Sequence, residues 1–190
     1  MKCTKLDIPF PFRAQSYREP GLHLSEIIQD LAMTLYPKKY TSRFDSLPED
    51  KQAEIRLRME LGFIWESALS IAFGNDFVPR YDNVERDGIW MNPDGVDIME
   101  GILYEYKCTS TSCEKPPTDN QLWMWQVKAY CWAFGITTSR MYVLYIDGDH
   151  KYPKHPVWQP YEIEFTLAEL EENWTMICNH AQTMKERATR

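Results

Sequence analysis

Apolar residues recur at helical spacing in the first third of the chain, and this pattern predicts two helices. The first covers about residues 25–35 and ends before Pro37, because proline cannot continue a helix. Its apolar face consists of Ile27, Ile28, Leu31 and Leu35. The second covers about residues 49–73, because Pro48 favours a helix start and Gly74 favours a helix end.

Between residues 77 and 108 the pattern changes to short apolar and β-branched runs, which predict strands. The runs are Val78, 88–91, 96–99 and 102–108. Glu100-Gly101 lies between the last two runs, so we expect a two-residue hairpin turn there.

The rest of the chain alternates between helix and strand signals. A loop rich in Thr, Ser and Pro over residues 109–120 leads into a helix that Gly135 ends. Two apolar runs predict further strands, and Thr166 forms a capping box with Glu169 for the last helix. The expected bounds are 120–134 for the first of these helices, 141–146 and 161–165 for the strands, and 166–187 for the last helix.

This order of elements predicts a single α/β domain over residues 1–190, in which helices flank a central mixed β-sheet. Residues 1–21 hold three prolines and show no periodicity, so we expect an extended N-terminal arm. The arm would dock on its own domain or on a neighbouring copy in a homo-oligomer. No apolar run approaches the roughly 20 residues of a membrane span, and no signal peptide is recognisable, so we expect a cytoplasmic protein without membrane contact.

Charge and cysteine content limit the chemistry. The net charge of −7 and the pI of about 5.2 count against an extended nucleic-acid surface, although a small basic groove fits within that total. The five cysteines are scattered without a C-x-x-C pair, so we expect neither a zinc site nor an iron–sulfur cluster. Among the histidines, His150, His155 and His180 are expected at the surface.

The predicted hairpin carries a candidate site. Glu105 and Lys107 share one strand face, because alternate residues of a strand point the same way. A two-residue turn puts Asp94 opposite Lys107 on that face, whereas a three-residue turn puts Asp97 there. Two carboxylates suit Mg²⁺, which polarises a phosphodiester and acidifies water. The ammonium orients or deprotonates that water, or stabilises phosphate charge. A solvated hairpin face with ordinary charges is the alternative interpretation.

Two helices contribute further candidates. Glu66 is the only charged residue over residues 61–74, and a carboxylate on an apolar face is costly unless it binds metal or pairs with an arginine. In the helix at 120–134, Trp123, Gln126 and Tyr130 share one face. A polar stripe on an apolar helix suggests a site, although Gln126 can equally hydrogen-bond a neighbouring backbone.

Taken in order, these motifs resemble the PD-(D/E)XK nuclease superfamily, particularly its lambda exonuclease and RecB-like branch. The motifs are Gly62-x-x-x-Glu66, Pro93-Asp94-Gly95, Glu105-Tyr106-Lys107-Cys108, and Gln126 with Tyr130. They lie within about residues 60–147, less than half of the chain. The resemblance implies a restriction-endonuclease-like sandwich, which agrees with the element order above.

The resemblance also implies a metal site. Asp94 and Glu105 would be the principal ligands of Mg²⁺, for which Mn²⁺ would substitute. The backbone carbonyl of Tyr106 would add a ligand, and Glu66 would bind or support the metal.

The same resemblance implies roles for the remaining residues. Lys107 would be the catalytic lysine. Gln126 and Tyr130 would position the site or the DNA backbone. Thr109 and Ser110, just after the strand, would contact a phosphate.

The function expected from these residues is a metal-dependent DNA exonuclease of phage recombination or replication type. Its partners would be DNA and a single-strand annealing or other recombination protein. One alternative is an endonuclease that cuts junctions, flaps or a specific site. Another is a nuclease-fold binding protein without activity, which the negative charge favours and the retained site residues argue against.

Overall fold

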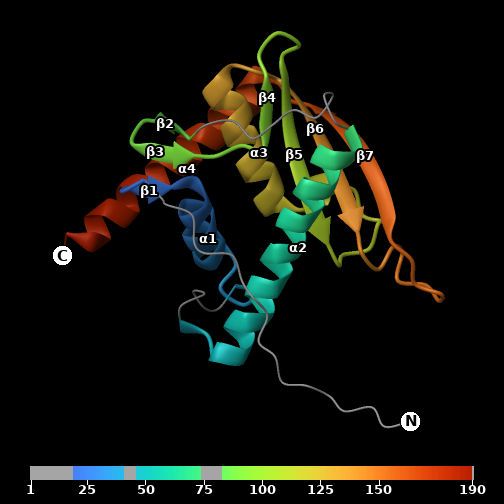
Figure 1. Ribbon diagram of the computed structural model, residues 1–190. Helices are drawn as coiled ribbons and strands as arrows, with labels where there is room; N and C mark the ends of the chain where they lie inside the picture. The colour runs from blue at the N-terminus through green and yellow to red at the C-terminus, as the bar shows by residue number, and fades with distance from the viewer. Residues whose placement is uncertain (1–18, 41–45, 74–82, 190) are drawn as a thin grey trace.

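A mixed β-sheet with helices on both faces forms the centre of the molecule (Figure 1). The structure is a computed structural model and describes residues 19–40, 46–73 and 83–189. Within these residues the larger sheet has the order β4–β5–β6–β7, in which β5 and β6 are parallel and the outer pairs are antiparallel. Its strands are β4 (Gly95–Asp97), β5 (Ile102–Thr109), β6 (Thr138–Tyr145) and β7 (Val157–Glu164).

A smaller sheet lies beside the larger one, whereas the sequence predicted one central sheet. Its strands, in the order β1–β3–β2, are β1 (Leu22–His23), β2 (Val84–Arg86) and β3 (Ile89–Met91). Pro93 lies between β3 and β4 and has no N–H to donate to a ladder, so the strand run divides there into two sheets. The strand expected at Val78 lies outside the described residues, as does most of the N-terminal arm.

The helices begin and end within about a residue of the predicted positions. Asn120 caps its helix by accepting the N–H of Trp123, and Gly135 ends that helix with a left-handed φ of 66°. Thr166 and Glu169 form the predicted capping box. The helices are α1 (Leu24–Leu35), α2 (Glu49–Phe73), α3 (Gln121–Phe134) and α4 (Leu167–Ala188), and the predicted loop before α3 contains the short 3-10 helix η3 (Pro117–Asp119).

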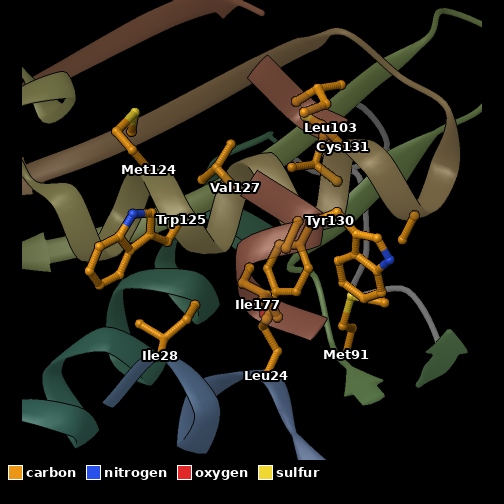
Figure 2. Close-up of a cluster of buried hydrophobic side chains, with 14 of the residues drawn as sticks. Leu24, Ile28, Met91, Leu103, Met124, Trp125, Val127, Tyr130, Cys131 and Ile177 are labelled. Carbon is orange, nitrogen blue, oxygen red and sulfur yellow. The ribbon is translucent and has the colours of Figure 1, made fainter. Parts of the chain in front are cut away.

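The two faces of β5 meet different helices. On one face, α1, α3 and α4 pack together and bury the main core, which Figure 2 shows around Leu103, Val127 and Ile177. On the other face, α2 packs through Leu69 against a smaller aromatic cluster that includes Tyr104 and Tyr106. None of the helices in the described part of the chain is long and apolar enough to cross a membrane.

The hairpin between β4 and β5 has a longer loop than predicted. Gly95 pairs with Tyr104 and Asp97 with Ile102, so four residues, 98–101, connect the strands and the predicted two-residue turn is wrong. The physical reason is the side chain of Asp97, whose Oδ1 accepts the N–H groups of Met99 and Glu100 at 3.0 and 2.9 Å. These two hydrogen bonds stabilise the four-residue loop, so the strands are not forced into a two-residue turn.

One histidine is buried, contrary to the sequence prediction. His180 of α4 is only 8% exposed, and its Nε2 lies 2.9 Å from the carboxylate of Asp30 in α1. His150 and His155 are exposed, as predicted.

Candidate active site

The odd-numbered residues of β5 point at α3, because the even-numbered ones face α2. Leu103 therefore enters the main core, and Glu105 follows it on the same face. The Glu105 side chain is only 2% exposed, which is costly for a carboxylate without a compensating charge. Lys107 comes next on this face, and its side chain is 17% exposed. The strand thus carries a buried carboxylate at Glu105 and, two residues further along, a more exposed ammonium at Lys107.

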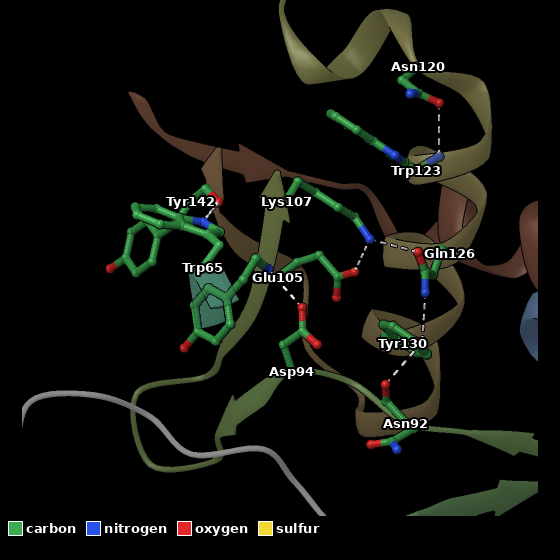
Figure 3. Close-up of polar contacts among 11 residues, drawn as sticks. Trp65, Asn92, Asp94, Glu105, Lys107, Asn120, Trp123, Gln126, Tyr130 and Tyr142 are labelled. Atoms are coloured by element: carbon green, nitrogen blue, oxygen red, sulfur yellow. Dashed lines mark hydrogen bonds and ion pairs between the residues drawn. The ribbon is translucent and has the colours of Figure 1, made fainter. Parts of the chain in front are cut away.

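Asp94 lies on the same face, immediately before β4. Its Oδ2 accepts the N–H of Tyr106 at 2.8 Å, so the carboxylate takes the place of a strand neighbour where the ladder ends (Figure 3). The register extended by one pair puts Asp94 opposite Glu105 rather than Lys107, two residues from the predicted pairing but on the predicted face. Asp97 pairs with Ile102, which faces α2, so the alternative carboxylate is not part of this cluster.

Lys107 is held between two elements. Its Nζ forms an ion pair with Oε1 of Glu105 and donates a hydrogen bond of 3.0 Å to Oε1 of Gln126 in α3. Burial lowers the pKa of Lys107, but the Glu105 and Asp94 carboxylates raise it more, so its net pKa lies above the ordinary value. The side chain is therefore an ammonium at neutral pH, which compensates the buried carboxylate.

Gln126 links Lys107 to a third segment. Its Nε2 donates to the hydroxyl of Tyr130 at 2.9 Å, and that hydroxyl donates to the backbone carbonyl of Asn92 at 3.2 Å (Figure 3). Asn92 is two residues before Asp94, whose carboxylate returns to β5. The bonds therefore run from β5 through α3 to the segment before β4 and back to β5. The alternative that Gln126 only bonds a neighbouring backbone is wrong.

Glu66 lies on a different element from the residues described so far. It lies on α2, which packs against the opposite face of β5. Burial, and then nearby negative groups that include Asp94 and Glu66, raises the pKa of Tyr106 well above its usual range, so Glu66 lies near that ring. The Glu66 residue is half-buried.

The loop after β5 contains the predicted phosphate contacts. Thr109 is half-buried, and its hydroxyl accepts the N–H of Thr111 at 3.1 Å. Ser110 is exposed, and its carbonyl lies 2.8 Å from Nε2 of His150. Both residues lie at the end of the strand that bears Lys107.

The donor set has the chemistry that Mg²⁺ prefers. Mg²⁺ binds through one or two carboxylates and otherwise keeps water or phosphate oxygens. Asp94 and Glu105 supply two carboxylates on one face, and the carbonyl of Tyr106 shares an edge with its N–H, which bonds Asp94. Among the described residues, no group of three or more His, Cys, Asp or Glu side chains is arranged to hold a metal. The two carboxylates on one face, Asp94 and Glu105, therefore fit a cation that needs few protein ligands.

Sequence reasoning missed one participant, the backbone carbonyl of Asn92. A main-chain acceptor has no residue-type signature, so no sequence signal pointed to it. The face shared by Trp123, Gln126 and Tyr130 was visible from helical spacing, and the structure does place all three beside Lys107 or its partners.

The comparisons with known proteins concern the fold. No protein-family model matches the chain, and no curated protein matches its sequence significantly. A phage-related exonuclease from Haemophilus somnus 129PT has a similar structure, with a TM-score of 0.51, 11% identity, and 87% of this chain and 82% of that chain covered. An alkaline exonuclease, LHK-Exo from Laribacter hongkongensis, aligns with a TM-score of 0.49, 14% identity, and 90% and 92% of the two chains covered.

The predicted architecture is confirmed. The arrangement of the sheet and helices is that of a restriction-endonuclease-like α/β fold, and the chain shares this fold with the phage-related exonuclease. The resemblance seen in the sequence motifs thus extends to the fold.

Proposed function

We propose that this protein is a metal-dependent DNA exonuclease of phage recombination or replication type. The observation that supports it most is the convergence of Asp94, Glu105 and Lys107 on one sheet face, with Gln126 of α3 bonded to the lysine. Two carboxylates and an ammonium do not pack better than apolar side chains would at these positions, so their presence points to a role other than packing. The fold shared with a phage-related exonuclease gives independent support.

Mg²⁺ is the proposed cofactor, with Mn²⁺ as a substitute. Asp94 and Glu105 would hold it, helped by the Tyr106 carbonyl, while a direct or supporting role for Glu66 stays a prediction. When bound, the metal would polarise the phosphodiester and lower the pKa of water.

Lys107 would stabilise the negative charge that develops on the phosphate during cleavage. Its ammonium is already positioned by Glu105 and Gln126, so little reorganisation is needed when substrate arrives. Gln126 and Tyr130 would position this lysine and the Asp94 segment. Phosphate contacts by Thr109 and Ser110 stay predictions.

Labelled DNA separates the candidate activities. The substrates are linear duplex and single strands labelled at the 5′ or 3′ end, incubated with and without Mg²⁺. They should release mononucleotides from one of the two ends, and only when metal is present. A closed circular duplex should resist cleavage. Degradation of the circle at the same rate as the linear form would favour the endonuclease alternative, and no hydrolysis with Mg²⁺ or Mn²⁺ would favour the inactive binding protein.

Further partners follow from the proposed activity. Strand resection produces single strands, so a single-strand annealing or other recombination protein is the expected partner, in the cytoplasm of the cell in which the chain acts. A homo-oligomer also stays a prediction. It is supported by α2, on which several large apolar residues are exposed: Leu57, Met59, Leu61, Ile64 and Ile71.

A further inference from the structure

Trp123 lies beside the candidate active site and has no assigned role. It occupies the first turn of α3, three residues before Gln126, and its ring centroid is 6.0 Å from Nζ of Lys107 (Figure 3). Asn120 caps this turn by accepting the N–H of Trp123, so the position of the residue is fixed. The side chain is half-buried, which leaves part of the indole open to a ligand.

Three tryptophans of the molecule use their indole N–H in fixed bonds, and Trp123 is not one of them. Trp65, Trp132 and Trp174 donate their indole N–H to fixed acceptors, at 3.3 Å to the Tyr142 carbonyl, 3.0 Å to Glu171 and 2.9 Å to Asp87. Within residues 19–40, 46–73 and 83–189, the indole N–H of Trp123 makes no such bond. A half-exposed indole ring whose N–H is available to a ligand therefore lies next to Lys107, the residue proposed to stabilise the phosphate charge.

From this geometry we infer that Trp123 is a substrate-binding residue that stacks on the base of the nucleotide whose phosphate reaches Lys107. The inference rests on the proposed nuclease function. A nucleotide joins an anionic phosphate to a flat base, and the pair Lys107 and Trp123 offers a cation that lies over one face of a flat ring, whose other face would take the base. Stacking on an aromatic side chain tolerates every base, because every base has a π-face.

This contact also defines the class of substrate. A base inside a duplex has both faces covered by its neighbours, so it reaches an aromatic ring only after leaving the stack. A base at a strand end or in a single strand is free to do so. Trp123 would therefore select a terminal or unpaired nucleotide, which agrees with an enzyme that works from DNA ends.

The test pairs a change in the protein with a change in the DNA. Single-stranded oligonucleotides are prepared with one abasic nucleotide at successive positions from the end, and cleavage and binding are measured for wild type and Trp123→Leu. Leucine keeps an apolar side chain against the core but removes the aromatic face. Wild type should lose about 5-fold or more in binding at one abasic position. Trp123→Leu should bind intact DNA correspondingly less tightly and should no longer discriminate against the abasic strand.

Two further variants keep the result interpretable. Trp123→Phe retains an aromatic face and should keep part of the discrimination. Trp158→Leu, on β7, removes a half-exposed tryptophan on the opposite face of the sheet and should behave as wild type. Circular dichroism and thermal melting confirm that each variant is folded.

The outcomes separate the two proposals. If wild type cleaves DNA but is indifferent to abasic positions, or if Trp123→Leu keeps the discrimination, the stacking role is refuted while the nuclease function stands. If wild type neither cleaves nor binds any DNA, both proposals fail together.

Discussion

At the scale of single residues, Lys107 owes its position to acceptors from two different elements. Glu105 belongs to its own strand and Gln126 to α3, so the ammonium is fixed relative to both. A charge held before the substrate arrives stabilises a transition state without reorganisation, and such stabilisation is usually the largest single contribution to catalysis.

Replacement of Lys107 by alanine tests this role. The Lys107→Ala protein should cleave DNA about 100- to 1000-fold more slowly, because one pre-positioned charge is lost. Lys107→Arg keeps the charge but not the compact ammonium, and should recover only part of the rate. Steady-state rates on labelled duplex give the measurement. A Lys107→Ala protein that cuts like wild type would refute the proposed mechanism.

The Tyr130 hydroxyl is linked to Lys107 through the side chain of Gln126. It is buried, accepts from Gln126 and donates to the Asn92 carbonyl, two residues before Asp94. Tyr130→Phe should weaken the apparent Mg²⁺ affinity of the activity about 5- to 10-fold, because the bond to the Asn92 carbonyl that positions the Asp94 segment contributes about 1 kcal/mol. A metal titration of the cleavage rate measures it. Tyr161→Phe, which loses a hydroxyl bonded to that of Tyr145 outside the site, is the matched control. Equal behaviour of the two variants would contradict the positioning role.

At the scale of elements, the hairpin assigns different tasks to its two aspartates. Asp97 holds the turn by accepting two backbone N–H groups, whereas Asp94 reaches across to β5 on the site face. We expect Asp97→Ala to lower the free energy of unfolding by about 1 to 2 kcal/mol and to retain activity. Asp94→Asn should keep the fold and lose nearly all DNA cleavage. Urea unfolding and the nuclease assay together decide, and the reverse pattern would make Asp97 the functional residue.

The sequence predicted the helices far better than the strand register. Helix bounds followed from Pro48, Gly135 and the Thr166 capping box, all of which act within one turn of the chain. The register depended on the Asp97 side chain, which stabilises a four-residue loop that glycine at position 101 alone does not predict. The face of Asp94 was nevertheless correct, because a shift of two residues preserves the side of the strand.

At the scale of the whole molecule, what escaped prediction depends on contacts between distant segments. Glu66 lies across β5 from Glu105 because α2 covers the opposite face of the sheet, and no local pattern specifies which face a helix takes. His180 was expected at the surface, yet it pairs with Asp30, which lies 150 residues earlier. Arg187 reaches the same Asp30 carboxylate at 3.1 Å.

This buried pair joins α1 to α4 behind the main core. Removal of His180 leaves the Asp30 carboxylate with one fewer partner in a buried place, and His180→Ala should lower the free energy of unfolding by about 1 to 3 kcal/mol. Arg187→Ala should cost less than about 1 kcal/mol, since the Arg187 side chain is half-exposed. Chemical denaturation measures both. Neither change should alter the rate of DNA cleavage by the folded protein.

The proposed function depends on Asp94 and Glu105, which would support metal-dependent cleavage of DNA. The most direct measurement follows nucleotide release from end-labelled linear DNA by wild type and Glu105→Gln in parallel, across a Mg²⁺ titration and with EDTA. Wild type should release nucleotides only with metal, and Glu105→Gln should be on the order of 100-fold slower at every metal concentration. Equal rates for the two proteins, or wild-type cleavage that persists in EDTA, would contradict it.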